Sequence, residues 1–216
     1  MSKSLDDVFK LYPPRPEAAF RKIIESLEPY GERIILDKND IFDVNFRSTK
    51  PRVYLIVEGE FSVHRRSDSL IIATGKGPAF CGLIEYVQQR GFQFCKPLSQ
   101  CVVVVVHADV AVQAITEHNL WKEISIIMMW YVQMLSARDE HLVGVSAYSM
   151  LKNKLIEIMD YPVERRRSIS VASYVISRTM LSRSTIMRML SDLLEGGYIT
   201  MEKGKLLDMK NLPEKY

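Results

Sequence analysis

The sequence predicts an α+β fold in which a β-roll is followed by a long helix and then by a smaller unit of helices and a hairpin. Short runs rich in Val, Ile, Phe and Tyr occupy residues 31–107, and glycines and a proline separate them. Regular short strands with such turn signals are typical of an antiparallel roll. From Leu120 onward the apolar residues recur at helical spacing instead. We therefore expect three regions, 1–118, 119–143 and 144–216.

The first region is predicted to open with a helix and continue as strands. The segment "PEAAFRKIIESLEPYG" reads as a small helix that closes at Gly31. The expected strands are "ERIIL", "RVYLIV", "EFSVHRR", "SLIIAT", "FQF" and "CVVVVVH". Gly59 lies between the second and third of these and is placed to turn a hairpin. The β-branched run after Cys101 is predicted to be a buried strand.

The second region is predicted to be one long helix. A stripe with alternating steps of four and three residues comprises Leu120, Ile124, Ile127, Tyr131 and Met134. A second apolar set beside it comprises Trp121, Met128, Val132, Leu135 and Leu142. One face of such a helix can cover the β-roll while the other meets a second copy of the chain. The alternative is a helix buried between two domains of a monomer.

The third region is predicted to be a helix-turn-helix with a wing. A helix "AYSMLKNKLIEIMD" precedes two helices, "SVASYVISRTM" and "SRSTIMRMLSDLLEGG", which a tight turn joins. The second of these ends at Gly196 and Gly197, a helix-stop signal. The tail "YITMEKGKLLDM" reads as a hairpin around Lys203, Gly204 and Lys205. The two lysines of this wing are placed to contact backbone phosphates.

The helix after Ser182 carries the main functional hypothesis. Ser182 is placed as its N-cap, and the expected buried stripe comprises Ile186, Met189, Leu190, Leu193 and Leu194. The opposite face comprises Arg183, Ser184, Met187, Arg188 and Ser191, with no acid before Asp192. Arginine can bond guanine in the major groove, and hydroxyls such as that of Thr185 suit phosphate. The alternative is an ordinary solvated face.

Charge supports this hypothesis only weakly. From Tyr161 onward there are ten Lys/Arg and six Asp/Glu, a balance of +4, whereas the whole chain carries +3. A mildly basic C-terminal unit fits a polyanionic partner, although solvated helices often carry as much charge.

The C-terminal segment resembles the winged helix-turn-helix of the cyclic-AMP receptor protein and fumarate-nitrate regulator superfamily. The family pattern Ser-Arg-x-Thr-hydrophobic-x-Arg, with its later apolar positions, is matched at Ser182, Arg183, Thr185, Ile186, Arg188, Leu190, Leu194 and Ile199. The order of parts agrees over nearly the whole chain, and within the superfamily the chain resembles the divergent IprA/YaiV type of regulator.

The resemblance implies a cyclic-nucleotide-binding-like jelly roll, a dimerising helix and DNA binding. Arg183 and Arg188 would read bases or anchor phosphates, with Ser184 between them. The acidic residue that the family usually carries at that middle position is absent, which leaves the sequence preference open. The resemblance also allows RNA polymerase as a further partner.

The ligand cassette of the family is altered in this chain. Cyclic-nucleotide binders carry Gly-Glu-hydrophobic and a later Arg-Ser or Arg-Thr pair; here Leu83 follows Gly82, Glu85 comes a turn too late, and Arg90 precedes a glycine. Burying a phosphate without a fixed cation is costly. We therefore expect no cyclic AMP binding and no cofactor.

Three cysteines fall within the same region and leave a second possibility. Cys81, Cys95 and Cys101 could make the roll a redox sensor, or they could pack as small buried hydrophobes. A different small molecule could also bind the altered site. The N-terminus has no cysteine cluster for iron–sulfur ligation, and the histidines lack metal-ligand spacing.

The composition favours a cytoplasmic regulator over an enzyme or a membrane protein. No apolar run approaches the ~20 residues that span a bilayer, and the N-terminus reads unlike a secretory signal. No nucleophile motif or carboxylate pair stands out. We expect a homodimeric, sequence-specific regulator that binds a roughly palindromic double-stranded DNA site. The alternative from another class is a protein-interaction module whose winged helix does not read DNA.

Overall fold

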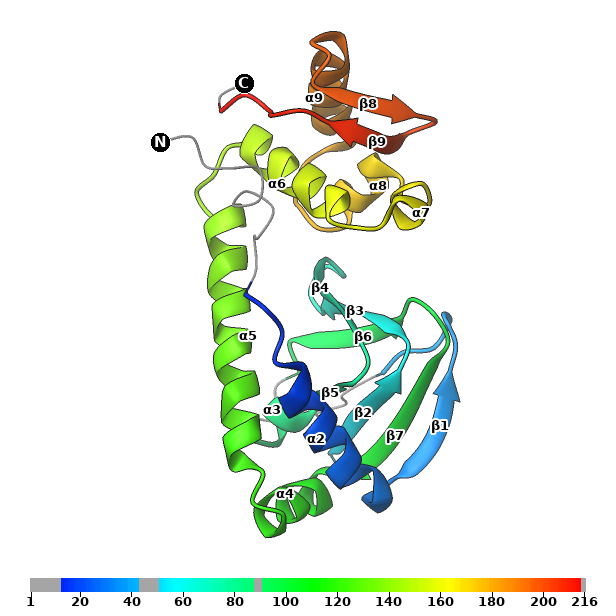
Figure 1. Cartoon of the computed structure of the whole chain (residues 1–216), viewed down its shortest axis with the longest axis vertical. Helices are drawn as coiled ribbons and strands as arrows, with labels where there is room; N and C mark the ends of the chain where they lie inside the picture. Colours follow the sequence, from blue (N-terminus) through cyan, green and yellow to red (C-terminus); the bar gives the residue numbers. More distant parts are fainter. Residues whose placement is uncertain (1–12, 43–50, 88–90, 215–216) are drawn as a thin grey trace. The chain divides into compact units, whose positions relative to one another are not determined.

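The computed structural model describes residues 13–42, 51–87 and 91–214 (Figure 1). The chain is divided into two compact units. One unit comprises Pro14–Tyr131 and the other contains Val132–Tyr216, so the division falls inside the long helix. Arg90 of the predicted cassette lies outside the described residues.

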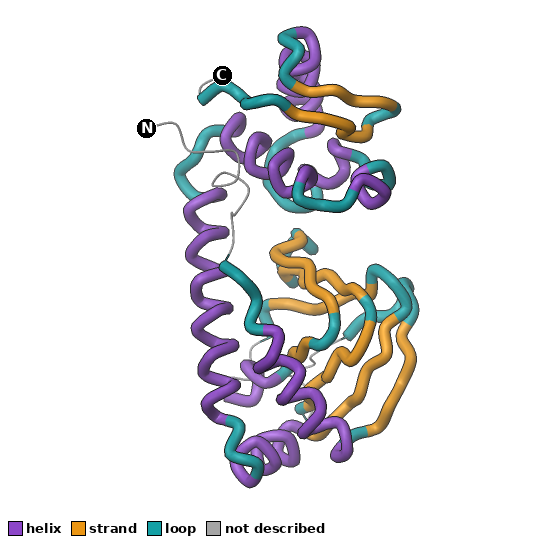
Figure 2. The backbone as a smooth tube through the Cα atoms, viewed as in Figure 1, coloured by secondary structure: helices purple, strands orange, loops and turns teal. Residues whose placement is uncertain are grey.

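The first unit contains the expected β-roll. Its elements are α2 (Glu17–Leu27), η1 (Glu28–Tyr30), β1 (Glu32–Leu36), β2 (Arg52–Glu58), β3 (Glu60–Arg65), β4 (Ile71–Lys76), β5 (Ala79–Cys81), α3 (Leu83–Val87), β6 (Gln93–Pro97), β7 (Cys101–His107) and α4 (Ala108–Glu117). The strands form an antiparallel sheet in the order β1-β7-β2-β5 and a second in the order β4-β3-β6 (Figure 2). The six predicted strands are all present.

The four-stranded sheet is buried on both faces. In β7, Val104 and Val106 pack with helices α2 and α4, whereas Cys101 and Val103 pack between the sheets. Successive residues of a strand point to opposite faces, so a continuous apolar run such as "CVVVVV" suits a strand covered on both sides. Phe42 is fully buried between the sheets beside the rings of Tyr54 and Phe61. The interior of the roll is therefore filled largely by apolar side chains.

The long helix α5 (Trp121–Leu142) covers its own β-roll with the stripe that the sequence predicted. Leu120, which directly precedes α5, and Ile124 and Ile127 are buried in the core of the first unit, and Tyr131 packs against the same core. The sequence analysis assigned these residues, with Met134, to a dimer helix. The structure places the first four toward their own chain because the apolar face of the sheet needs a cover.

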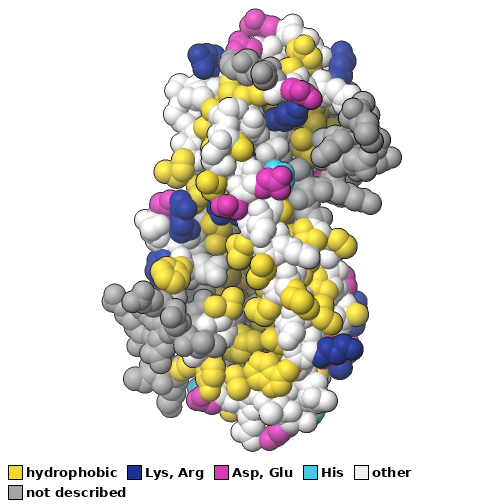
Figure 3. Space-filling view, turned by 90° about the vertical axis from the view of Figure 1, so that its left-hand side faces the viewer, with side chains coloured by type: hydrophobic (Ala, Val, Ile, Leu, Met, Phe, Trp, Pro, Cys, Tyr) yellow, Lys and Arg dark blue, Asp and Glu magenta, His cyan; other side chains and the backbone are white. Residues whose placement is uncertain are grey.

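A second apolar face of α5 stays exposed. Its large exposed members are Trp121, Met129, Val132 and Leu135. Hydrophobic side chains gather on the face shown in Figure 3, which looks onto the side where α5 lies in Figure 1. An apolar surface of this kind is typical of an interaction site.

The second unit is the predicted winged helix-turn-helix. After the end of α5 it contains α6 (Ala147–Met159), α7 (Val163–Arg166), α8 (Val171–Ile176), α9 (Arg183–Glu195), β8 (Ile199–Glu202) and β9 (Lys205–Met209). One apolar core joins α6, α8, α9 and the hairpin. The sequence analysis did not separate α7 from a charged linker, and it did not resolve α3, α4 and β5.

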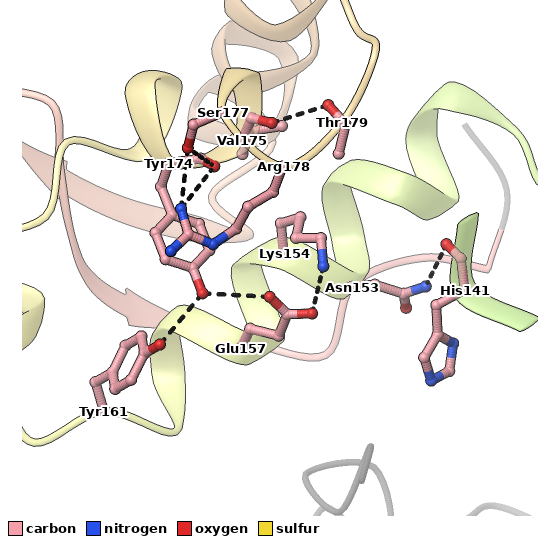
Figure 4. Close-up of polar contacts among 10 residues, drawn as sticks. All are labelled: His141, Asn153, Lys154, Glu157, Tyr161, Tyr174, Val175, Ser177, Arg178 and Thr179. Carbon is pink, nitrogen blue, oxygen red and sulfur yellow. Dashed lines mark hydrogen bonds and ion pairs between the residues drawn. The ribbon is translucent and has the colours of Figure 1, made fainter. Parts of the chain in front are cut away.

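A buried polar network ties α6 to α8 (Figure 4). Lys154 and Glu157 of α6 form an ion pair with little solvent exposure. The Tyr174 hydroxyl of α8 donates to Glu157 Oε2 at 3.2 Å and lies 3.4 Å from the Tyr161 hydroxyl. The Arg178 guanidinium stacks 3.7 Å above the Tyr174 ring. Burial, reinforced by the Glu157 carboxylate, raises the pKa of Tyr174, so this hydroxyl keeps its proton and remains a donor.

The backbone conformation at residue 82 and the atoms around it both require a glycine there. Its φ is +102°, and a Cβ there would lie 2.3 Å from the Arg52 carbonyl oxygen. Gly144 also has positive φ, +70°, but a Cβ there meets nothing within 4 Å. Gly144→Ala should therefore lower the free energy of unfolding by about 1 kcal/mol, the cost of the backbone conformation alone. Gly82→Ala should cost at least about 2 kcal/mol more because the backbone must also move.

Urea unfolding followed by circular dichroism measures both variants of these glycines. Equal stabilities for Gly82→Ala and Gly144→Ala would contradict the close approach of Arg52 to this turn.

Candidate nucleic-acid interface

Helix α9 begins at a serine cap, as the sequence predicted. The Ser182 hydroxyl accepts a hydrogen bond from the Thr185 backbone N–H at 3.1 Å. The same oxygen lies 2.9 Å from the Ser184 hydroxyl and 2.8 Å from the Thr185 hydroxyl. Three hydroxyls therefore cluster at the positive end of the helix dipole, where an anion is favoured.

One stripe of α9 is buried in the core of the winged unit. Ile186, Met189, Leu190 and Leu193 are all nearly inaccessible. Leu194, the fifth residue expected in this stripe, is 42% exposed. Eight residues after Ile186 correspond to a rotation of about 80°, which carries Leu194 off the buried face.

The opposite face of α9 presents the predicted polar residues to solvent. Its exposed members through the first turns are Arg183, Ser184, Met187, Arg188 and Ser191. The first turn contains no acidic residue. Both arginines are therefore exposed near small hydroxyls, a combination that suits a negatively charged and hydrogen-bonding partner.

The wing is a tight hairpin fixed to the start of α8. Lys203 and Gly204 form its two-residue turn with φ of +48° and +77°, the positive values that this type of hairpin turn requires. Lys203 is exposed at the tip. The Lys205 ammonium instead donates to the Ser168 carbonyl at 2.9 Å, and the Val171 N–H donates to the Gly204 carbonyl at 3.0 Å. The two predicted wing lysines thus have different surroundings.

A shallow cleft of about 450 Å³ lies where α9 meets the N-terminus of α6. Its lining includes Ser146, which precedes α6, Ser149 of α6, Thr185 and Arg188 of α9, and the acidic residue Glu214. Ser146 caps α6 by accepting the Ser149 N–H at 3.0 Å. The start of this helix at Ala147 agrees with the sequence prediction, but the sequence did not indicate that Ser146 and Ser149 would lie beside α9. Arg188 therefore borders hydroxyls from two helix starts.

The three cysteines near the altered ligand region of the roll differ in how far they are exposed to solvent. Cys95 is 2% exposed and Cys101 is inaccessible, whereas Cys81 at the end of β5 is half-buried. The Cys101 thiol donates to the Glu60 carbonyl at 3.3 Å, and burial together with the Glu60 carboxylate raises its pKa. Leu83, which follows Gly82, packs against the core beneath the helices.

Two further observations concern the part of the chain that the structure describes. It contains no group of three or more His, Cys, Asp or Glu residues arranged to hold a metal ion. None of its helices is both long enough and apolar enough to span a lipid bilayer.

Comparisons with known proteins agree with this arrangement. A family model described as winged helix-turn-helix DNA binding matches residues 147–214. The protein named "Inhibitor of hydrogen peroxide resistance" from Escherichia coli K12 is 31% identical over 94% of this chain and 98% of its own length.

Solved structures show the same fold over most of the chain. A CooA mutant from Carboxydothermus hydrogenoformans has a TM-score of 0.64 at 12% identity and covers 94% of each chain. A Crp/Fnr family regulator from Eubacterium rectale has a TM-score of 0.54 at 14% identity, with 89% of this chain and 90% of its own covered. The chain therefore belongs to the family of the protein named Inhibitor of hydrogen peroxide resistance, it shares the fold of these solved Crp/Fnr-type structures, and its residues 147–214 match the winged helix-turn-helix DNA-binding model.

Proposed function

We propose that this regulator is a homodimer that reads a roughly palindromic double-stranded DNA site through α9 and acts without cyclic AMP. The observation that carries the proposal is the outward face of α9, where Arg183 and Arg188 are exposed beside small hydroxyls and no acid interrupts the first turn. Arginine can make paired hydrogen bonds to guanine O6 and N7 in the major groove.

The neighbouring elements supply contacts that position such a helix. The Lys203 ammonium at the tip of the wing is free to approach a phosphate, and the starts of α9 and α6 border one cleft with Arg188. Helix N-termini and hydroxyls favour phosphate oxygens. Two copies of α9 would enter successive major grooves about one helical turn apart, which gives the site its two-fold symmetry.

The exposed face of α5 supports the homodimer. Met129, Val132 and Leu135 lie on a helix whose other apolar face is already buried against the roll. Burial removes apolar surface from water at about 25 cal/mol per Å², so a second copy of the same helix is a favourable cover. The two faces of α5 thus have separate partners, its own roll and the α5 of another chain.

Independence from cyclic AMP is supported by the contents of the roll. Leu83 packs into an apolar core where the family carries a carboxylate, and Phe42 and Phe61 fill the space between the sheets. A cyclic phosphate buried among such side chains would lack the donors that compensate for its lost hydration.

The DNA assignment predicts different effects for arginine and lysine variants. Arg183→Ala and Arg188→Ala should each reduce discrimination against a wrong base by about 5- to 150-fold, the range expected for a lost bidentate contact. Arg183→Lys should keep the charge but lose the discrimination, since an ammonium lacks the planar fork. Lys203→Ala should weaken binding to all DNA sequences alike. It should also reduce the slope of log K against log salt concentration by about one per half-site. Lys205→Ala should do less, because its ammonium is held by Ser168.

Fluorescence anisotropy with duplexes selected from random DNA measures these effects at several salt concentrations. Lys122→Ala on α5 is the matched control for loss of a surface cation and should bind as wild type. The same curves run with and without cyclic AMP should coincide. Unchanged preference in both arginine variants, or no sequence-specific binding at all, would favour the protein-interaction alternative.

The dimer assignment predicts the oligomeric state of charged variants. Val132→Glu and Leu135→Glu should each shift the protein toward a monomer in light scattering coupled to gel filtration, because a carboxylate in an apolar helix seam is unpaired. Val143→Glu replaces an equally exposed valine just beyond α5 and should leave the dimer intact. A dimer that survives both α5 changes would place the interface elsewhere.

A thiol sensor is the second candidate function, because the Escherichia coli relative is named for hydrogen peroxide resistance. The thiolate is the form that reacts, and a raised pKa keeps Cys101 protonated. Cys81 is the most accessible of the three thiols in the structure.

Thiol labelling of the folded protein at pH 7 should therefore modify Cys81 first and Cys101 last, as read by mass spectrometry after peptide cleavage. Labelling of Cys101 should keep accelerating as the pH rises toward its raised pKa, and it should also accelerate on unfolding. Rapid peroxide oxidation of Cys101 in the folded dimer would support a buried redox switch and contradict this order.

A further inference from the structure

Met187 is the apolar member of the outward face of α9. It is 49% exposed and lies one turn after Arg183 and Ser184, directly before Arg188. The buried stripe of the helix is complete without it, since Ile186 and Met189 on either side are buried. Met187 is also absent from the described side chains that pack against the core of the winged unit. Its long apolar side chain therefore has no packing role that would account for it.

The major groove offers a specific partner for such a side chain. Among the groups that base pairs present there, the 5-methyl group of thymine is the apolar one, while the others donate or accept hydrogen bonds. A thioether chain is flexible and polarizable, so it adapts to a methyl group at the floor of a groove. The guanidinium groups of Arg183 and Arg188 on either side would hold the helix there by contacts to guanine or phosphate.

We propose that Met187 is a specificity-determining residue that reads a thymine by contact with its 5-methyl group. The inference rests on the proposed function, because it requires α9 to enter the major groove. It also locates the thymine. Met187 follows Arg183 by about 6 Å along the helix axis, and base pairs are about 3.4 Å apart. The thymine should therefore lie within about two base pairs of the base that Arg183 contacts.

Replacement of thymine by deoxyuridine tests the contact, since it removes the methyl group and leaves base pairing unchanged. The probe is the symmetric duplex selected from random DNA by the wild-type protein, with each thymine replaced in turn in both half-sites. At one thymine per half-site the wild type should bind about fourfold more weakly for each methyl group removed. Met187→Ala should bind the thymine and deoxyuridine duplexes equally well.

Two further variants separate apolar contact from side-chain length. Met187→Gln keeps the length but is polar, so it should also lose the preference for thymine over deoxyuridine. Met187→Leu, which stays apolar, should retain most of the preference for thymine over deoxyuridine. The matched control is Met180→Ala, because Met180 is 78% exposed but lies in the turn before α9 rather than on its outward face. This control should show the wild-type sensitivity to deoxyuridine.

The outcomes distinguish this inference from the function on which it rests. If no duplex is bound in preference to others, the proposed function fails. Met187 does not read thymine if a preferred site exists but no deoxyuridine replacement weakens binding. The same conclusion follows if the replacement weakens binding by Met187→Ala as much as binding by the wild type. Loss of the sensitivity in Met180→Ala as well would assign the effect to the turn and overturn the role of Met187.

Discussion

The burial of one stripe on α9 is the constraint on which the rest of the winged unit depends. Ile186, Met189, Leu190 and Leu193 each remove an apolar side chain from water, at about 1.5–3 kcal/mol for a full burial. Once that stripe is fixed, the rotation of the helix is fixed too, and Arg188 necessarily points away from the core, whereas Arg183 is exposed as the first residue of the helix. The polar network around Tyr174 then holds α8 against α6. The chemistry of the outward face is thus a consequence of how the inward face packs.

The β-roll depends on two apolar cores that lie on opposite faces of its four-stranded sheet. Its central strand β7 alternates between two cores, with Val104 and Val106 beneath the helices and Cys101 and Val103 between the sheets. At the turn after β5, Leu83 packs against the core beneath the helices, and the Arg52 carbonyl leaves no room for a Cβ at Gly82. Side-chain packing therefore constrains one of these adjacent residues and backbone geometry constrains the other.

Much of this architecture could be predicted from the sequence, because local patterns carried it. The Ser182 cap and the apolar period after it defined α9, and the β-branched runs defined the strands. The orientation of α5 could not be predicted in the same way, since this helix is apolar around most of its circumference and periodicity does not say which face meets the roll. The bond from Lys205 to Ser168 spans 37 residues and has no local signal. Burial of Cys95 and Cys101 likewise depends on how the two sheets close together.

The attachment of the wing has a mechanical consequence. The Gly204 carbonyl and the Lys205 ammonium both join the hairpin to the start of α8, and α8 in turn shares a core with α9. Little freedom is left for the hairpin to move as a hinge against the helix. A conformational change that reaches this part of the chain must then move the hairpin, α8 and α9 together as one rigid body, or unfold them. In the proposed homodimer, DNA binding would depend on the distance between the two winged units, which must match the helical repeat of the DNA.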